Sequence, residues 1–474
     1  MCGPIQRGLS VGKSLYLCTG VVFFLLASWG RPAGAAHFAP DSGTLLAEMS
    51  AHISRSLTSS PTSSSSSVFC NFFGVAPDYA PWTLRSSDVD GAYVVLKYTF
   101  DQAPATLPKT IVFAWHRSGL YPPWIVYYTR ETISDEIKIS ADGDVAFWRT
   151  EPVGPSQPIA QTELRVCSIN SNNLASQLGA YSCASDIHTG AIAEVILHTA
   201  STPGIFGVLT NQPDGSFTEL DWSGDRLFFT RSRQSTLVLS LEFWDQFTQT
   251  STQLDSASMS SSSPGMFWIN QADANGVVGF NHFDLSGLFT GSAAVTVKGI
   301  APSQGPGSLS YGAPNFSDRQ QAFMGSARSA GFFSMGGELH AIYVPQPSLG
   351  LNTALMLRSS ADNYLGMQPA ITLPAGKTFA YRPMRVSSQI FGELLMVQSG
   401  SANMASAIEV YQYLPSGIPG VVGSYLHVET VNLPSGFTEV SLDSATDAPL
   451  WGGAMVLLGA GSGAPLRHAL ISCL

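Results

Sequence analysis

The sequence predicts an all-β protein, built as an antiparallel β-sandwich or jelly roll with a second β domain or a large loop insertion. Short stretches rich in Val, Ile, Phe, Tyr and Thr recur along the chain, each bounded by Gly, Pro, Asp or Asn. Helical periodicity is almost absent between them, which favours antiparallel sheets. Charged residues make up only 12% of the chain, against 45 Gly and 29 Pro. This composition excludes a coiled coil, a charged helical bundle and a disordered polyelectrolyte.

Residues 1–35 have the pattern of a secretory signal peptide. Two basic residues precede an apolar run at 15–27, and small residues follow it. The run is shorter than the ~20 residues of a membrane span, so we expect cleavage between Ala35 and Ala36. A signal anchor, or a buried segment of the mature protein, is the alternative.

Residues 36–67 are expected to form a short helix and a Ser-rich linker. Over 44–57, Leu45, Leu46, Met49 and Ile53 share one helical face, with Thr44 as a plausible cap. The Ser/Thr/Pro tract that follows cannot bury apolar surface, which predicts a flexible segment open to O-glycosylation. The remaining chain is divided into 68–199 (first part of the β-sandwich), 200–389 (a β-rich insertion or projecting domain) and 390–474 (closing strands and a C-terminal arm).

The predicted strands are short, and no internal repeat of fixed period is evident. A short helix is expected at 448–458, and a loop over the Gly-, Ser- and Pro-rich residues 303–330. The strands are predicted at 92–100, 110–115, 124–129, 136–139, 145–148, 162–167, 194–197, 205–209, 226–230, 236–243, 266–269, 277–280, 294–298, 339–344, 355–358, 378–381, 385–398, 408–414 and 423–431.

Four cysteines would remain after signal cleavage: Cys70, Cys167, Cys183 and Cys473. An even number in a secreted chain permits disulfides, and four cysteines allow three pairings. Cys167 and Cys183 are nearest in sequence, so this pair is the first predicted disulfide. Four free buried thiols are the alternative, because a core of this size does not need cross-links.

One N-glycosylation sequon is present at Asn315, followed by Phe316 and Ser317. It lies among Gly and Pro, where a surface loop is expected. A single sequon in a chain of this length is near the chance level.

No catalytic, cofactor-binding or metal-binding motif is recognisable. The nine histidines are scattered singly, and the chain has no zinc-ligand spacing, no Gly-x-Ser-x-Gly elbow and no phosphate-binding loop. Residues 273–276 imitate the start of an EF-hand loop but lack its Glu at the twelfth position, so an Asn-Gly hairpin is the simpler interpretation. Residues 142–144 are likewise interpreted as a turn. No catalytic residue, cofactor or metal ligand is therefore assigned.

Two acidic clusters surround tryptophans, as glycoside hydrolysis would require. The first has turn composition, so solvated carboxylates are the better interpretation and no catalytic role is assigned. The clusters are Asp214, Glu219, Asp221 and Asp225 around Trp222, and Glu242 with Asp245 around Trp244.

Three segments together resemble the jelly-roll capsid (coat) protein of small positive-strand RNA viruses. Residues 162–190 are similar to a strand ending in an Asn/Ser turn, 391–415 to the closing hairpin, and 443–458 to the C-terminal arm. The resemblance implies a structural subunit without enzyme activity that self-assembles into a shell around the genome and is found in the virion. Low charge suits a chain that its own copies bury extensively.

The expected partners are therefore copies of the chain itself, and a host-cell surface receptor or glycan. Nucleic acid is only weakly supported, because the net charge is −10 and no basic arm is present. The alternative is a secreted or cell-surface β-sandwich protein, not an enzyme, that binds glycans or another surface; a secreted hydrolase ranks third. The aromatic platforms of that alternative would be exposed members of Trp82, Trp115, Trp124, Trp148, Trp222 and Trp244.

Overall fold

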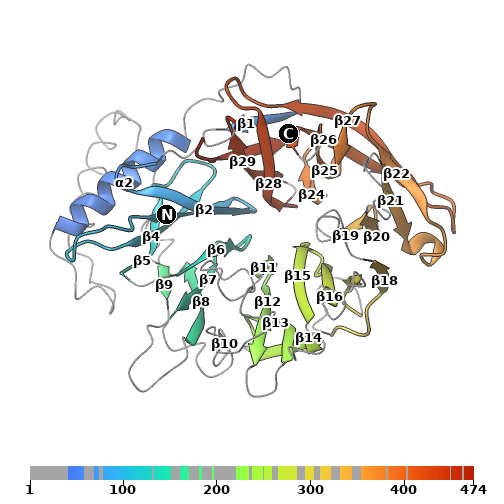
Figure 1. Ribbon diagram of the computed structural model, residues 1–474, viewed down its shortest axis with the longest axis horizontal. Coiled ribbons are helices and arrows are strands. Elements are labelled where there is room, and N and C mark those ends of the chain that lie inside the picture. The colour runs from blue at the N-terminus through green and yellow to red at the C-terminus, as the bar shows by residue number, and fades with distance from the viewer. Residues whose placement is uncertain are drawn as a thin grey trace, which may run out of the picture.

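The chain forms seven β-sheets arranged as the blades of a ring, as Figure 1 shows in a computed structural model. It is a seven-bladed β-propeller, so the predicted β-sandwich or jelly roll with a second domain or insertion is wrong. The strands were expected to stack as two opposed sheets, whereas each sheet here packs on two neighbours around an axis. The structure describes residues 41–57, 69–73, 78–130, 133–150, 161–169, 181–183, 195–196, 220–233, 238–248, 250–258, 265–284, 294–303, 310–321, 331–343, 354–379, 383–401, 404–448, 450–461 and 464–473.

In the first three blades the chain runs from the innermost strand outwards. Blade 1 consists of β2 (Thr83–Asp90), β3 (Tyr93–Thr99), β4 (Thr110–His116) and β5 (Trp124–Thr129). Blade 2 consists of β6 (Ile133–Ile139), β7 (Val145–Thr150), β8 (Gln161–Ile169), β9 (Tyr181–Cys183) and β10 (Val195–Ile196). Blade 3 consists of β11 (Leu220–Ser223), β12 (Arg226–Arg233), β13 (Val238–Asp245) and β14 (Thr250–Ser258).

Blades 4 to 6 repeat this order, with two short inner strands in blade 6. Blade 4 consists of β15 (Gly265–Ala272), β16 (Val278–Asp284), β17 (Ala294–Ile300) and β18 (Phe316–Gln321). Blade 5 consists of β19 (Gly331–Met335), β20 (Glu338–Tyr343), β21 (Ala354–Ser359) and β22 (Gln368–Thr372). Blade 6 consists of β23 (Thr378–Phe379), β24 (Met384–Ser388), β25 (Gly392–Ser401), β26 (Met404–Leu414) and β27 (Ser424–Asn432).

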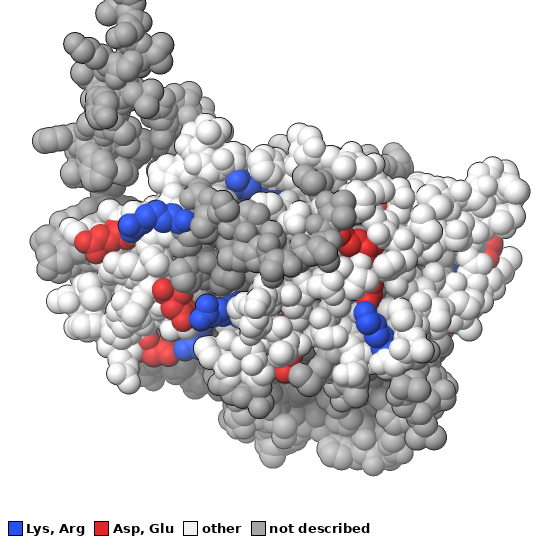
Figure 2. Space-filling view, turned by 90° about the horizontal axis from the view of Figure 1, so that it is seen from above, with Lys and Arg blue, Asp and Glu red and all other residues white. Residues whose placement is uncertain are grey.

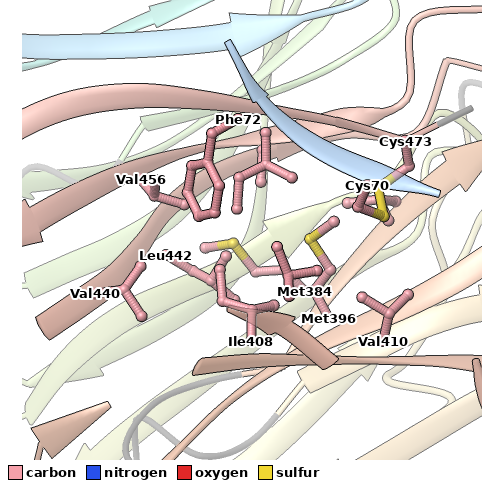
Figure 3. Packing of buried hydrophobic residues seen from close by; sticks show 14 of the residues in the cluster. Cys70, Phe72, Met384, Met396, Ile408, Val410, Val440, Leu442, Val456 and Cys473 are labelled. Atoms are coloured by element: carbon pink, nitrogen blue, oxygen red, sulfur yellow. A yellow bond between two sulfur atoms is a disulfide. The ribbon is translucent and has the colours of Figure 1, made fainter. Parts of the chain in front are cut away.

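Blade 7 closes the ring with strands from both ends of the described chain. Its strands β28 (Glu439–Thr446), β29 (Gly453–Gly459) and β30 (Arg467–Cys473) are completed by β1 (Cys70–Phe73). β1 pairs with β30 in antiparallel register, and Cys70 is bonded to Cys473 by a disulfide across 403 positions. Figure 3 shows this disulfide at the edge of the packed side chains between blades 6 and 7, which include Phe72, Met384 and Met396.

Apolar burial is distributed between blades rather than in one central core. Among the described residues, seven hydrophobic clusters lie between the seven pairs of adjacent blades. Between blades 1 and 2, for example, Val95 and Val112 share a cluster with Ile139 and Phe147. Each blade is covered on both sides by its neighbours, so its strands carry apolar residues on both faces.

The predicted N-terminal helix is present as α2 (Asp41–Leu57), which begins before the predicted cap Thr44. Leu46, Met49 and Ile53 are buried in the cluster of blade 1. The Ser-rich linker lies outside the described residues. In the part of the chain that the structure describes, no helix has the length and apolarity needed to cross a membrane.

Two local predictions fail because small residues occur within strands. Residues 448–458 contain the strand β29 instead of a helix, since both faces of that strand are buried, and residues 303–330 contain β18 instead of a continuous loop. A third prediction fails for the opposite reason, because the strand expected at 385–398 is divided between β24 and β25 by a turn.

In every blade, the inner strand is joined to the next strand by a short loop, which closes the first hairpin of that blade. Each of these loops contains, or is directly followed by, a glycine with positive φ. At Gly91, with φ 50°, a Cβ atom would also approach the backbone of Ala141 in the next blade to 3.1 Å. These hairpins lie on one face of the ring, the hairpin face. The glycines are Gly91, Gly143, Gly224, Gly276, Gly336, Gly392 and Gly453.

Charged side chains are sparse on the visible side of the molecule in Figure 2, where most described atoms belong to uncharged residues. Asp88, Asp90, Lys138 and Asp221 lie on inner strands, around the propeller axis.

Candidate functional site

A cavity of about 220 Å³ lies where the inner strands end, at the hairpin face. We call it the channel pocket. Blades 1, 2, 3, 4, 6 and 7 contribute to its lining, which contains four aspartates and one lysine: Asp88, Asp90, Asp221, Asp447 and Lys138. The ring thus brings charged residues of blades 1, 2, 3 and 7 to one place.

Most carboxylates around the axis connect one blade to the next. An inner strand has one edge without a neighbouring strand, and its N–H groups need acceptors. In four successive blade pairs, a carboxylate accepts a hydrogen bond from the backbone N–H of the following blade. Asp88 accepts from Ile139 (2.8 Å), Glu136 from Leu220 (2.7 Å), Asp221 from Ala272 (2.7 Å) and Asp273 from Ser334 (2.9 Å).

A second group of side chains crosses the axis, and we call it the bridge: Gln271, Asp273, Arg385, Glu393 and Asp447. Gln271 exchanges two hydrogen bonds with the backbone of Arg385, at 3.0 and 2.9 Å. The Arg385 guanidinium bonds to Asp447, to Glu393 at 2.6 Å, and lies 3.7 Å from Asp273. Burial alone would lower the pKa of Arg385. The three carboxylates raise this pKa by more than burial lowers it, so the guanidinium stays charged. The bridge connects blades 4, 6 and 7 directly.

Within the pocket, Lys138 lies beside the buried carboxylate of Asp88, with 3.5 Å between Nζ and Oδ1. Burial raises the pKa of Asp88, and the charge of Lys138 opposes that shift. Burial lowers the pKa of Lys138, but Asp88 and Asp221 raise it by more. The lysine therefore stays protonated, and its charge is compensated by its neighbours.

Asp90 differs from these groups because it has no cation. Its Oδ1 accepts hydrogen bonds from its neighbour Gly91 (2.8 Å) and from the Thr446 hydroxyl (2.9 Å). Among the described residues, nothing donates to Oδ2, and Asp90 forms no ion pair. Its pKa is raised well above the usual range, first by burial and then by the charges of Asp447, Asp88 and Asp221. Asp90 thus presents a carboxyl oxygen to the cavity in a negative environment.

The other predicted site residues are dispersed. β8 and β9 pair Cys167 with Cys183 in register, and their disulfide stays a prediction. Asn315 is exposed directly before β18, and its glycosylation also stays a prediction. The signal cleavage site between Ala35 and Ala36 lies outside the described residues.

The predicted tryptophan platforms are mostly buried. Trp124 is partly exposed, whereas the other five have at most 4% of their surface accessible, because they fill the spaces between blades. The buried five are Trp82, Trp115, Trp148, Trp222 and Trp244.

The two acidic clusters separate in the structure. Asp221 is part of the inner strand β11 and lines the pocket, so its interpretation as a solvated turn residue was wrong. Glu242 and Asp245 are buried in β13, where Arg231 and Arg226 lie beside them. Asp214 and Glu219 lie outside the described residues. Asp273 accepts N–H groups of its own hairpin, which confirms the predicted turn, and no three metal-ligand side chains converge among the described residues.

Sequence reasoning missed Asp90 and Asp447 entirely. A local signal was present for Asp90, which directly precedes a hairpin glycine at the end of a strand. Its partner Thr446, however, is 356 positions away and approaches only when the ring closes.

No protein-family description matches the chain, and no curated protein matches its sequence. Some solved structures resemble it weakly. A prolyl endopeptidase structure has 10% identity and a TM-score of 0.44, covering 98% of this chain and 56% of the other. The β-propeller domain of the trilobed protease from Pyrococcus furiosus has 11% identity and a TM-score of 0.39, and the match covers 82% of this chain and 93% of that domain. The polysaccharide lyase Uly1 has 10% identity and a TM-score of 0.43, and the match covers 85% of this chain and 91% of the lyase.

These findings correct the functional prediction. The chain spans about half the length of the prolyl endopeptidase, and identities this low say nothing about what it binds or acts on. The predicted viral capsid subunit is wrong because its jelly roll is replaced by a propeller. The β-sandwich alternative fails for the same reason. The expectation of no enzyme activity depended on the capsid resemblance, so it is overturned together with the jelly roll.

Proposed function

We propose that this protein binds a cationic group of an organic ligand in the channel pocket, with Asp90 as the counter-charge. The observation that carries the proposal is the carboxyl oxygen of Asp90, which faces a cavity without a partner among the described residues and is surrounded by further carboxylates. An ammonium or guanidinium group would supply both the missing charge and the missing donors.

The size of the cavity limits the ligand. At about 220 Å³ it is smaller than the ~300–1,000 Å³ of typical small-molecule pockets. A group of the size of a lysine or arginine side chain suits this volume. Because the pKa of Asp90 is raised, its carboxyl group holds a proton more readily than usual. When the cation binds, its hydrogen-bond donors would take the place of that proton.

The test is calorimetric titration of the full chain with Nα-acetyl-lysine amide and its uncharged analogue Nα-acetyl-norleucine amide. We expect only the cation to bind, with release of protons and with an affinity that rises with pH, because the raised pKa of Asp90 keeps its carboxyl group protonated above the usual range of an aspartate. Asp90→Asn should remove binding while keeping an acceptor for Gly91 and Thr446.

Asp101→Asn is the matched control, because Asp101 is an exposed carboxylate on blade 1. It should bind like the unmodified chain. Equal binding of both amides, no binding of either, or full binding by Asp90→Asn would contradict the proposal. Tight Ca²⁺ binding that depends on Asp90 would instead indicate a metal site.

A further inference from the structure

Beside the channel pocket, on the hairpin face of blades 1 and 7, five rings contact one another. We call them the aromatic ledge: Tyr93, His116, Tyr121, Trp124 and Trp451. Tyr121 is stacked on Trp124 with 5.8 Å between ring centroids. His116 meets Tyr93 at 5.0 Å and Trp451 at 5.7 Å, edge to face. Loops of two blades thereby form one continuous aromatic surface.

The ledge carries apolar side chains that nothing in the described chain covers. Leu120 is 79% exposed, Leu450 is 70% exposed and Tyr121 is 37% exposed. The two leucines flank the rings, Leu120 in the β4–β5 loop and Leu450 in the β28–β29 loop. Single exposed leucines are ordinary, but leucines grouped around stacked aromatic rings are typical of an interaction surface.

Arg117 holds the ledge in a fixed position. Its guanidinium donates to the backbone oxygens of Trp451 and Gly91, the latter at 3.4 Å, and to the hydroxyl of Ser472 at 2.9 Å. The guanidinium carbon also lies 5.6 Å from the centroid of the Trp451 ring. A surface fixed in this way loses little conformational entropy when it binds a partner.

The same contacts make the ledge continuous with the pocket. Gly91, which Arg117 binds, directly follows Asp90, and Ala448 of the pocket lies three positions before Trp451. Blades 1 and 7 are neighbours in the ring (Figure 1). A ligand whose cation reaches Asp90 therefore leaves the pocket beside the ledge.

The edge of this surface is acidic as well. Burial raises the pKa of Tyr93, and the nearby charges of Asp142 and Asp144 raise it further. Asp142 is exposed in the first hairpin of blade 2. The ledge thus lies between two negative regions, which complements a positively charged partner.

We infer that the ligand is a polypeptide segment in which a Lys or Arg enters the channel pocket and apolar side chains a few residues away pack on the aromatic ledge. This inference rests on the proposed function and names the partner class of the same site. A peptide is the ligand that combines a side-chain-sized cation with adjacent apolar groups. A neutral glycan would use the rings but would leave the Asp90 carboxylate unpaired, so it is an outcome of the test.

The test compares an acetylated, amidated tetrapeptide, Lys-Gly-Trp-Gly, with Nα-acetyl-lysine amide on the full chain. We expect the tetrapeptide to bind about tenfold more tightly, since an aromatic anchor contributes substantially at such surfaces. Tyr121→Ala and Leu450→Ala should remove this gain and leave the affinity for acetyl-lysine amide unchanged. Both side chains are exposed, so folding is retained. Leu365→Ala, an 83% exposed leucine on blade 5, is the matched control and should change neither affinity.

The outcomes distinguish the two proposals. If acetyl-lysine amide binds through Asp90 but the tetrapeptide gains nothing, or its gain survives both ledge variants, the polypeptide inference is wrong and the proposed function stands. If neither ligand binds, both fail. An uncharged oligosaccharide that binds Asp90→Asn protein, and loses affinity in Tyr121→Ala, would overturn the polypeptide inference in favour of a glycan.

Discussion

The bridge and the channel pocket lie around the same axis, and they differ in how their charges are paired. In the bridge, Arg385 is buried beside Asp273 and Asp447, and the partly exposed Glu393 is its third carboxylate. In the pocket, Asp90 has only other carboxylates among its strongest electrostatic neighbours. Compensated charges connect blades and serve the fold, whereas an uncompensated carboxyl that faces a cavity is available to a ligand. Clustered acidic residues alone would not have distinguished these roles.

The largest effect should follow from breaking the bridge. Arg385→Ala leaves Asp273, Glu393 and Asp447 without their cation, and removing one partner of a buried ion pair costs about 3–5 kcal/mol. We expect this loss in the free energy of unfolding, measured by urea denaturation. Arg85→Ala is the control, because Arg85 and its partner Asp101 are exposed and such pairs contribute about 0–1 kcal/mol. A bridge variant as stable as this control would mean that the bridge is not structural.

Ring closure provides a second test of what holds the blades around the pocket. Replacing both cysteines in Cys70→Ala/Cys473→Ala should lower the free energy of unfolding by about 2–4 kcal/mol, because the disulfide constrains a very long loop in the unfolded chain. β1 would still pair with β30, so the fold should persist. The urea midpoint of the unmodified chain should fall on adding reductant. If reductant lowers the urea midpoint of the variant as much as that of the unmodified chain, the effect of reductant belongs to another disulfide, such as the predicted Cys167–Cys183.

The sequence allowed many of the strands to be predicted, but not the inner strands β2 and β28 and not the arrangement of the sheets. Short runs of apolar, β-branched and aromatic residues at 110–115 and 145–148 were sufficient to predict β4 and β7, since local composition indicates a strand. The repeat was hidden because the hairpin glycines lie between about 50 and 80 residues apart, as the loops vary in length. The inner strand β11 was not predicted, because most of it belongs to a segment of turn composition, residues 221–225.

The site was harder to predict than the fold. Asp90 and Thr446 are 356 positions apart, and their hydrogen bond exists only after blade 7 meets blade 1. The low overall charge was informative in another way. Few residues of the chain are charged, yet four aspartates and one lysine lie together in the lining of the channel pocket.

Asp90 should lower the free energy of unfolding, whereas Arg385 should raise it. A carboxyl group whose pKa is raised in the folded chain is harder to ionise there, so it destabilises the fold above its unfolded pKa of ~3.9. Asp90→Asn should therefore raise the free energy of unfolding by about 1 kcal/mol near pH 8 and leave it unchanged near pH 4. Urea denaturation at both pH values measures this difference. A loss of stability near pH 8 would show that Asp90 is compensated after all, and would remove its distinction from the bridge.

The smallest effect should come from the rim of the pocket. Asp142 is exposed, so its attraction for an approaching cation is screened beyond ~8 Å at physiological salt. Asp142→Asn should weaken binding of Nα-acetyl-lysine amide about twofold at low salt, mainly through slower association, and should have no effect in about 1 M NaCl. Asp90→Asn should abolish binding at every salt concentration, because its contact is direct. If the order is reversed, with Asp142 decisive and Asp90 dispensable, the cation binds at the rim rather than in the channel.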